Sequence, residues 1–217
     1  MRTAAVPIYA WLSAALLAAL AAPACAAALE VTVTGPDNEP VPGVAVYVLQ
    51  AGRDAAAEPA AAVMDQRGKR FEPHLLIVQK GATVEFPNSD VVAHHVYSFS
   101  KPNNFVLPLY KGDPHDPVTF AHDGIVTLGC NIHDGMLGYI VVVDTDLFGV
   151  TGADGSLRVE LDEQAGAATV SIWSPRIRDR HLSRVVSATT PAISFTLDKK
   201  LRPPHDSGSE ALQWSDY

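Results

Sequence analysis

The chain has 217 residues, of which 24 are acidic and 16 are basic, so its formal net charge is −8. This acidic balance, with no cluster of Lys and Arg, argues against a protein that binds nucleic acid or an anionic membrane surface. Sixteen Pro and fifteen Gly separate short runs rich in Val and Ile, a composition typical of an all-β protein.

The first 27 residues have the features of a secretory signal peptide. Arg2 precedes an apolar run over residues 4–22, and Ala24-Cys25-Ala26 offers small residues for cleavage. We therefore expect a periplasmic or secreted bacterial protein with no membrane span after cleavage, which removes Cys25. One alternative is an uncleaved anchor, although an Ala-rich run is a weak span. Another is lipidation of Cys25, although the residues before it make a poor lipobox.

The following segments show the alternation of β-strands. Strands are predicted at 29–34 and 44–49, and Glu39-Pro-Val-Pro-Gly43 between them suggests a hairpin-like arrangement. The Ala-rich stretch 51–62 is expected to be a linker. Val84 and Phe86 are expected to face inward. Further strands are predicted at 83–86, within 91–100, and at 125–130, 139–143, 156–161, 168–173 and 192–197, followed by a polar tail at 201–217.

The most informative motif is Cys130-Asn-Ile-His133-Asp-Gly-Met136, which lies between two predicted strands. It spaces a thiolate, an imidazole and a thioether by three residues, and His94-His95 supplies a second imidazole from a separate strand. Two imidazoles and one thiolate in a plane, with a weak axial thioether, are the ligand set of a blue-copper electron-transfer site.

Cysteine usage supports this interpretation. After signal cleavage Cys130 is the one remaining thiol, and an unpaired thiol in an oxidising compartment is a hazard unless a metal occupies it. The alternative is a buried, inert Cys that acts as a small apolar residue. Asp134, beside His133, is expected either to orient that imidazole or to cap the turn.

The choice between His94 and His95 depends on which side chain enters the core, because neighbouring strand residues point to opposite faces. Alternation favours His95, since His95, Tyr97 and Phe99 form the more apolar stripe. Ligands at strand ends obey alternation only weakly, so on the residues alone either His94 or His95 could be the metal ligand.

The stretch from Val78 to Val143 resembles the cupredoxin (blue-copper) family. Gly81-Ala-Thr-Val-Glu-Phe-Pro-Asn88 is similar to the strand before the first ligand loop, His94 follows at amicyanin-like spacing, and Cys130-x2-His133-x2-Met136 resembles the short amicyanin-type loop. The wider pattern, with its His-His-Val-Tyr-Ser-Phe-Ser string, is also similar to bacterial methylamine-utilization or plastocyanin-like proteins.

This resemblance implies a Greek-key cupredoxin β-sandwich or barrel over residues 61–146. It also implies one type 1 copper with His94, Cys130, His133 and Met136 as its ligands. Cupredoxins commonly carry Asn after the first ligand, so His95 would stand where that Asn ties the two ligand loops together.

The flanking segments are similar to the small β-sandwich of carboxypeptidase regulatory-like domains. Their matching strings are Gly-Val-Ala-Val-Tyr-Val in 43–48 and Thr-Gly-Ala-Asp-Gly in 151–155. We expect an accessory sandwich of residues 29–50 and 147–200 that is split by insertion of the copper domain, an arrangement that costs little at a surface loop. Two consecutive domains are the alternative.

The expected function is to carry single electrons between redox partners such as a c-type cytochrome or a dehydrogenase. The resemblance to cupredoxins implies that His133 would be the exit for the electron, and the acidic surface would favour a basic partner. A copper storage or delivery protein without turnover is the main alternative. The acidic residues show no catalytic pairing, and Met136 argues against an open copper position, so we expect no enzyme.

Overall fold

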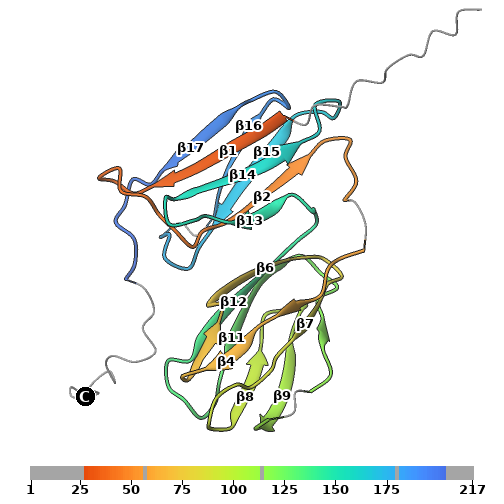
Figure 1. The fold of residues 1–217 in the computed structure, drawn as a ribbon, viewed down its shortest axis with the longest axis vertical. Coiled ribbons are helices and arrows are strands. Elements are labelled where there is room, and N and C mark those ends of the chain that lie inside the picture. Colours follow the sequence, from red (N-terminus) through yellow and green to blue (C-terminus); the bar gives the residue numbers. More distant parts are fainter. Residues whose placement is uncertain (1–26, 56–57, 113–114, 179–180, 204–217) are drawn as a thin grey trace, which may run out of the picture.

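The computed structural model describes residues 27–55, 58–112, 115–178 and 181–203. These residues form strands, turns and loops, so the all-β prediction is confirmed. Within this part of the chain, no helix is long and apolar enough to cross a membrane. The predicted signal peptide with Cys25, and the tail from residue 204 onward, lie outside the described residues. The strands fall into an upper and a lower group (Figure 1).

The upper group, which we call the flanking sandwich, is built from both ends of the described chain. One of its sheets has the order β14-β1-β17 and the other β13-β2-β15-β16. Its strands are β1 (Ala27–Thr34), β2 (Ala45–Gln50), β13 (Phe148–Val150), β14 (Ser156–Leu161), β15 (Ala168–Trp173), β16 (His181–Val186) and β17 (Ala192–Thr196). The two sheets enclose an apolar core that includes Leu29, Val31, Val46, Val48, Val170 and Ile172.

The predicted hairpin between the first two strands is wrong. β1 pairs with β14 and β17, whereas β2 pairs with β13 and β15. Both strands carry an alternating apolar face, and two such faces can be buried by packing two sheets against each other instead of pairing in one sheet. Residues 35–43 carry the chain across, with Asn38 in the left-handed region at φ 60°.

The lower group, which we call the central sandwich, holds all the predicted metal ligands. A sheet of order β6-β12-β11-β8-β9 encloses an apolar core with a sheet of order β10-β7-β3, and β4 and β5 form a separate hairpin. Its strands are β3 (Ala62–Val63), β4 (Asp65–Arg67), β5 (Arg70–Glu72), β6 (Leu75–Gln79), β7 (Thr83–Glu85), β8 (His94–Ser98), β9 (Phe105–Tyr110), β10 (Val118–Thr119), β11 (Gly124–Gly129) and β12 (Leu137–Val143). Val84 and Phe86 are buried in this core, as predicted.

The two groups share a small apolar interface. Leu75 and Ile77 of β6 and Val141 and Val143 of β12 pack with Trp173 of the flanking sandwich. The outer face of the β6–β12 pair is therefore covered by the other group of strands. We propose that the groups are two domains with the predicted boundaries, residues 29–50 and 147–200 for one and 61–146 for the other.

Candidate metal centre

Three of the four predicted ligands come together at one end of the central sandwich. His94 begins β8, Cys130 directly follows β11, and His133 lies in the loop from β11 to β12. One possible ligand atom from each residue lies within 4.8 Å of those from the other two. Among the described residues, these three side chains are therefore close enough together to bind one metal ion.

The distances among these atoms fit a shared metal ion. The Sγ atom of Cys130 lies 3.9 Å from Nδ1 of His94 and 3.7 Å from Nδ1 of His133. Zinc bond lengths serve as a gauge: a metal bound to a sulfur and an imidazole nitrogen at an angle of roughly 110–120° holds those two atoms about 3.5–3.8 Å apart. The donor set, one thiolate and two imidazoles, is also the set that copper accepts in both oxidation states.

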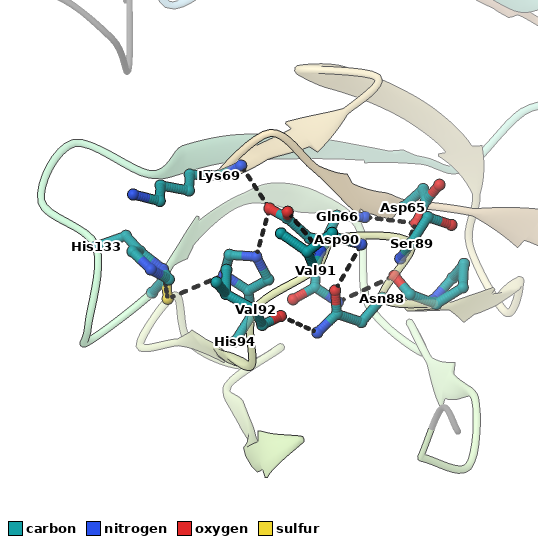
Figure 2. A network of polar contacts seen from close by, with 12 residues as sticks. Asp65, Gln66, Lys69, Asn88, Ser89, Asp90, Val91, Val92, His94 and His133 are labelled. Atoms are coloured by element: carbon teal, nitrogen blue, oxygen red, sulfur yellow. Dashed lines mark hydrogen bonds and ion pairs between the residues drawn. The ribbon is translucent and has the colours of Figure 1, made fainter. Parts of the chain in front are cut away.

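A carboxylate fixes the orientation of His94 (Figure 2). Nε2 of His94 lies 3.0 Å from Oδ2 of Asp90, and the imidazole itself is fully buried. Because a carboxylate only accepts hydrogen bonds, Nε2 carries the proton, and the lone pair of Nδ1 points toward Cys130. Such partners of ligating histidines set the tautomer and strengthen metal binding.

Asp90 is held in turn by backbone amides. The amide of Lys69 donates to Oδ2 at 2.8 Å, and the amide of Val91 donates to Oδ1 at 2.7 Å. The Lys69 amide, together with His94 and Val91, lowers the pKa of Asp90 from 3.8 to about 2, so the carboxylate is ionised at neutral pH. Neither the role of Asp90 nor the β4–β5 hairpin was predicted from sequence, although an Asp four residues before a candidate ligand was a usable signal.

A buried polar network supports the loop that carries Asp90. The Nδ2 atom of Asn88 donates to the carbonyls of Val92 and Tyr110, each at 3.0 Å, and its Oδ1 accepts from the amide of Asp90 at 3.0 Å. The Tyr110 hydroxyl donates to the carbonyl of Phe86 at 2.5 Å and accepts from Nε2 of Gln66. Residues 86–92 therefore have their polar groups fixed from several directions before any metal arrives.

His133 is half-buried, like Cys130 and unlike the fully buried His94. Its pKa is lowered from 6.5, mainly by burial and further by the charges of His94 and Lys69, while Asp90 acts in the opposite direction. The rings of His133 and His94 lie 4.7 Å apart between centroids and are tilted by 58°. An imidazole that favours its neutral form offers a lone pair to a metal. Among the described residues no hydrogen bond joins Asp134 to His133, and Asp134 is exposed.

Met136 takes a different position. It is 1% exposed and belongs to the apolar cluster of the central sandwich, against which Cys130 also packs. Its amide donates to the carbonyl of His133 at 3.2 Å, which closes the loop, and Gly135 at φ 75° allows that turn. Burial in the cluster against which Cys130 packs is compatible with an axial thioether, and that role stays a prediction.

Strand alternation pointed to the wrong histidine for burial. His94, Val96 and Ser98 face the core, while His95 and Tyr97 are half-buried and Phe99 is 77% exposed. The reason is that the apolar stripe lies on the outer face of the sheet, where its rings contact one another. Within the described part, the buried Nδ1 atom of His95 has no hydrogen-bond partner, so no tie between ligand loops is seen at that atom.

Comparisons with known proteins give structural neighbours only. No family model and no curated protein matches the chain. Among solved structures, it is similar to a purple cupredoxin from Nitrosopumilus maritimus, with 23% identity over 38% of this chain and 99% of that one, at a TM-score of 0.34. A variant of amicyanin matches with 21% identity over 45% of this chain and 99% of that one, at a TM-score of 0.35.

A third similar structure is a Cu-containing nitrite reductase from Thermus scotoductus, with 30% identity over 44% of this chain and a TM-score of 0.37. The match spans only 25% of that reductase. The neighbours named here are thus cupredoxins and a copper enzyme. Because all three TM-scores are well below 0.5, the residues of the site, and not these neighbours, support the function proposed next.

Proposed function

We propose that the chain is a blue-copper protein of the cupredoxin type that carries single electrons between redox partners outside the cytoplasm. The observation that carries this proposal is the convergence of the Cys130 thiol with two imidazole Nδ1 atoms at 3.7 and 3.9 Å. His94, Cys130 and His133 would hold one copper ion, with Met136 as a weak fourth ligand. When bound, copper supplies a one-electron change between Cu(II) and Cu(I).

The chain itself supplies a fixed and partly buried cage. His94 and Met136 are buried, and the Asp90 carboxylate holds one imidazole in a single orientation. A cage that keeps its geometry in both oxidation states reduces the reorganisation that accompanies electron transfer. His133, which is partly exposed, would be the route by which the electron leaves. The partner proposed from sequence is a c-type cytochrome or a dehydrogenase, and we propose no enzymatic turnover.

Addition of Cu(II) to the purified metal-free protein tests the proposal. We expect one copper per chain, an intense blue absorption band from the thiolate bond, and reversible loss of that band on reduction. Binding without the blue band, with Cu(I) preferred and readily passed to a chelator, would favour a storage or delivery protein. Failure to bind copper would contradict the proposal.

A further inference from the structure

The turn that joins β4 to β5 carries several basic residues and lies outside the proposed ligand set. We call Arg67, Gly68, Lys69 and Arg70 the basic turn. Gly68 and Lys69 lie in the left-handed region, at φ 59° and 60°. Gly adopts this conformation freely, whereas a Lys adopts it at a cost and keeps it only where surrounding contacts require it. The contact here is the hydrogen bond from the Lys69 amide to Asp90.

Further contacts attach the hairpin to the loop that carries Asp90. The amide of Gln66 donates to the carbonyl of Pro87 at 3.1 Å, and the amide of Ser89 donates to Oδ1 of Asp65 at 3.2 Å. The basic turn therefore keeps a fixed position relative to His94, whose Nε2 shares the Asp90 oxygen that Lys69 binds.

In the view of Figure 2 the Lys69 side chain runs toward the side of the site on which the imidazole of His133 lies. Lys69 is close enough to influence His133 electrostatically, because the positive charge of Lys69 contributes to lowering the pKa of His133. The neighbouring charges are largely paired: Arg67 contacts Asp65 at 3.1 Å, and Asp90 contacts His94. No ion pair joins the Lys69 ammonium to another group in the described part of the chain. The acidic residue next to His133 in sequence, Asp134, is exposed.

We propose that the Lys69 ammonium makes the surface beside His133 a contact site for an anionic group on the electron partner, and that it raises the reduction potential of the site. This inference rests on the proposed function. Oxidation of the copper adds one positive charge to the site, which a fixed cation nearby disfavours. The chain as a whole carries −8, whereas Lys69 contributes a positive charge near the proposed electron exit.

The two charges act at different distances. The net charge influences approach over about 10 Å or more and is screened by salt, whereas the Lys69 ammonium acts at contact. An anionic group that reaches His133 would therefore gain attraction there even though the molecule as a whole repels it.

The experiment compares Lys69→Gln with Lys101→Gln in the copper-loaded full chain. Lys101 is exposed and follows the far end of β8 from His94, so its substitution removes the same charge at a distance. Each reduced protein transfers one electron either to anionic ferricyanide, which becomes ferrocyanide, or to cationic tris(phenanthroline)cobalt(III), which becomes cobalt(II). No bond or proton changes in either reaction. The ratio of the two rates removes the effect of driving force.

We expect Lys69→Gln to lower the ratio of ferricyanide to cobalt rates by roughly threefold or more at low ionic strength, and high salt to remove the difference. Voltammetry should show a lower midpoint potential for Lys69→Gln and an unchanged one for Lys101→Gln. Lys69→Gly is the second variant. It keeps the backbone hydrogen bond to Asp90 and suits the left-handed turn, so it shows the effect of losing the charge without a change in backbone conformation.

The outcomes are distinguishable from failure of the proposed function. If the wild-type protein binds no copper, the proposed function itself is contradicted, and this result is obtained before any electron-transfer rate is measured. If copper binds, and both Lys69 variants keep the rate ratio and midpoint potential of Lys101→Gln, the inference about Lys69 is overturned while the copper site stands.

Discussion

The flanking and central sandwiches are both made of short strands around an apolar core, but they use buried polar side chains differently. In the flanking sandwich, Thr151 and Gln50 bond to backbone groups of adjacent loops. In the central sandwich, Gln66, Tyr110 and Asn88 form a connected network that leads through Asp90 to His94. The first arrangement closes loops, whereas the second positions a chemical group.

The difference shows what a metal centre requires of a β-sandwich. A buried polar group costs free energy unless it is hydrogen-bonded. The hydrogen bonds from Gln66 through Tyr110, Asn88 and Asp90 to His94 are continuous, although Oε1 of Gln66 has no partner among the described residues. Changes at the centre should therefore alter copper chemistry, and changes in the flanking sandwich should alter stability alone. The predictions below test that separation.

The largest effect is expected from Cys130→Ser. The hydroxyl is a harder and weaker donor than the thiolate, so the blue band should disappear and copper affinity should fall by at least about a hundredfold. Absorption spectroscopy and copper titration measure both, and thermal unfolding of the metal-free protein serves as the control. An unchanged spectrum would place the copper elsewhere.

The second prediction separates the adjacent histidines. His94 is fully buried and faces Cys130, whereas His95 lies on the outer face of the sheet. His94→Ala should eliminate the blue site, and His95→Asn should retain it with a small change in stability. The same titration applies to both variants. The opposite ranking would show that His95 turns inward when copper binds.

The third prediction concerns the positioning of His94. Asp90→Ala removes the acceptor that fixes its tautomer, and copper affinity should fall by about 10–100-fold without loss of colour at saturation. Asp90→Asn keeps an oxygen acceptor and should cost less. Competition with a chelator of known affinity gives the numbers. Equal affinity for Asp90→Ala and wild type would reduce Asp90 to a structural residue.

Asp90 should also make the metal-free protein sensitive to acid. Its pKa is lower in the folded state, about 2 against an ordinary 3.8, so its ionised form favours folding. That contribution is fully present above about pH 4 and is lost as the pH falls toward 2. Urea unfolding of wild type and Asp90→Asn across this range should show their stability difference shrinking toward acid pH.

The fourth prediction tests the flanking sandwich. The buried Thr151 hydroxyl accepts from the amide of Val44 at 3.0 Å and donates to the carbonyl of Val41 at 2.9 Å. Thr151→Val leaves both groups without that partner and should lower the free energy of unfolding by roughly 1–3 kcal/mol. Thr151→Ser is the matched control. The copper spectrum and potential should stay as in wild type, and a shifted spectrum would show that the two sandwiches are coupled.

Much of this fold could be predicted from local pattern, and the parts that could not be predicted depend on distant contacts. The strands 156–161 and 168–173 were predicted with the bounds of β14 and β15, because turns mark their ends and apolar residues alternate within them. β16 was missed because its edge position leaves most of its side chains exposed, without alternation. That β1 runs parallel to β17 is not encoded in either segment alone.

The same distinction holds at the centre. Cys130 and His133 were found because their spacing is a local signal, and His94 because of a resemblance. The Asp90–Lys69 contact was missed because β4 and β5 are three residues each and carry little apolar pattern. Gly68-Lys69 between two Arg residues was the one local sign of a tight turn, and nothing in the sequence placed that turn over the ligand loop.

The smallest effect is expected at Met136, where binding should persist and only the potential should change. The thioether of an axial Met forms a long, weak bond that favours Cu(I), while His94, Cys130 and His133 supply most of the affinity. Met136→Gln offers a harder oxygen donor and should lower the potential by on the order of tens of millivolts, with copper retained.

Met136→Leu is the matched control, because it keeps the apolar volume that Met136 fills among buried neighbours and removes only the sulfur. Leu leaves a lower coordination number, which favours Cu(I) even more than a weak thioether does, so Met136→Leu should raise the potential, in the opposite direction to Gln. Voltammetry with copper content measured in parallel distinguishes the cases. If both variants keep the wild-type potential at full copper occupancy, Met136 is a core residue that closes the loop through its amide, and the centre is set by its three remaining ligands.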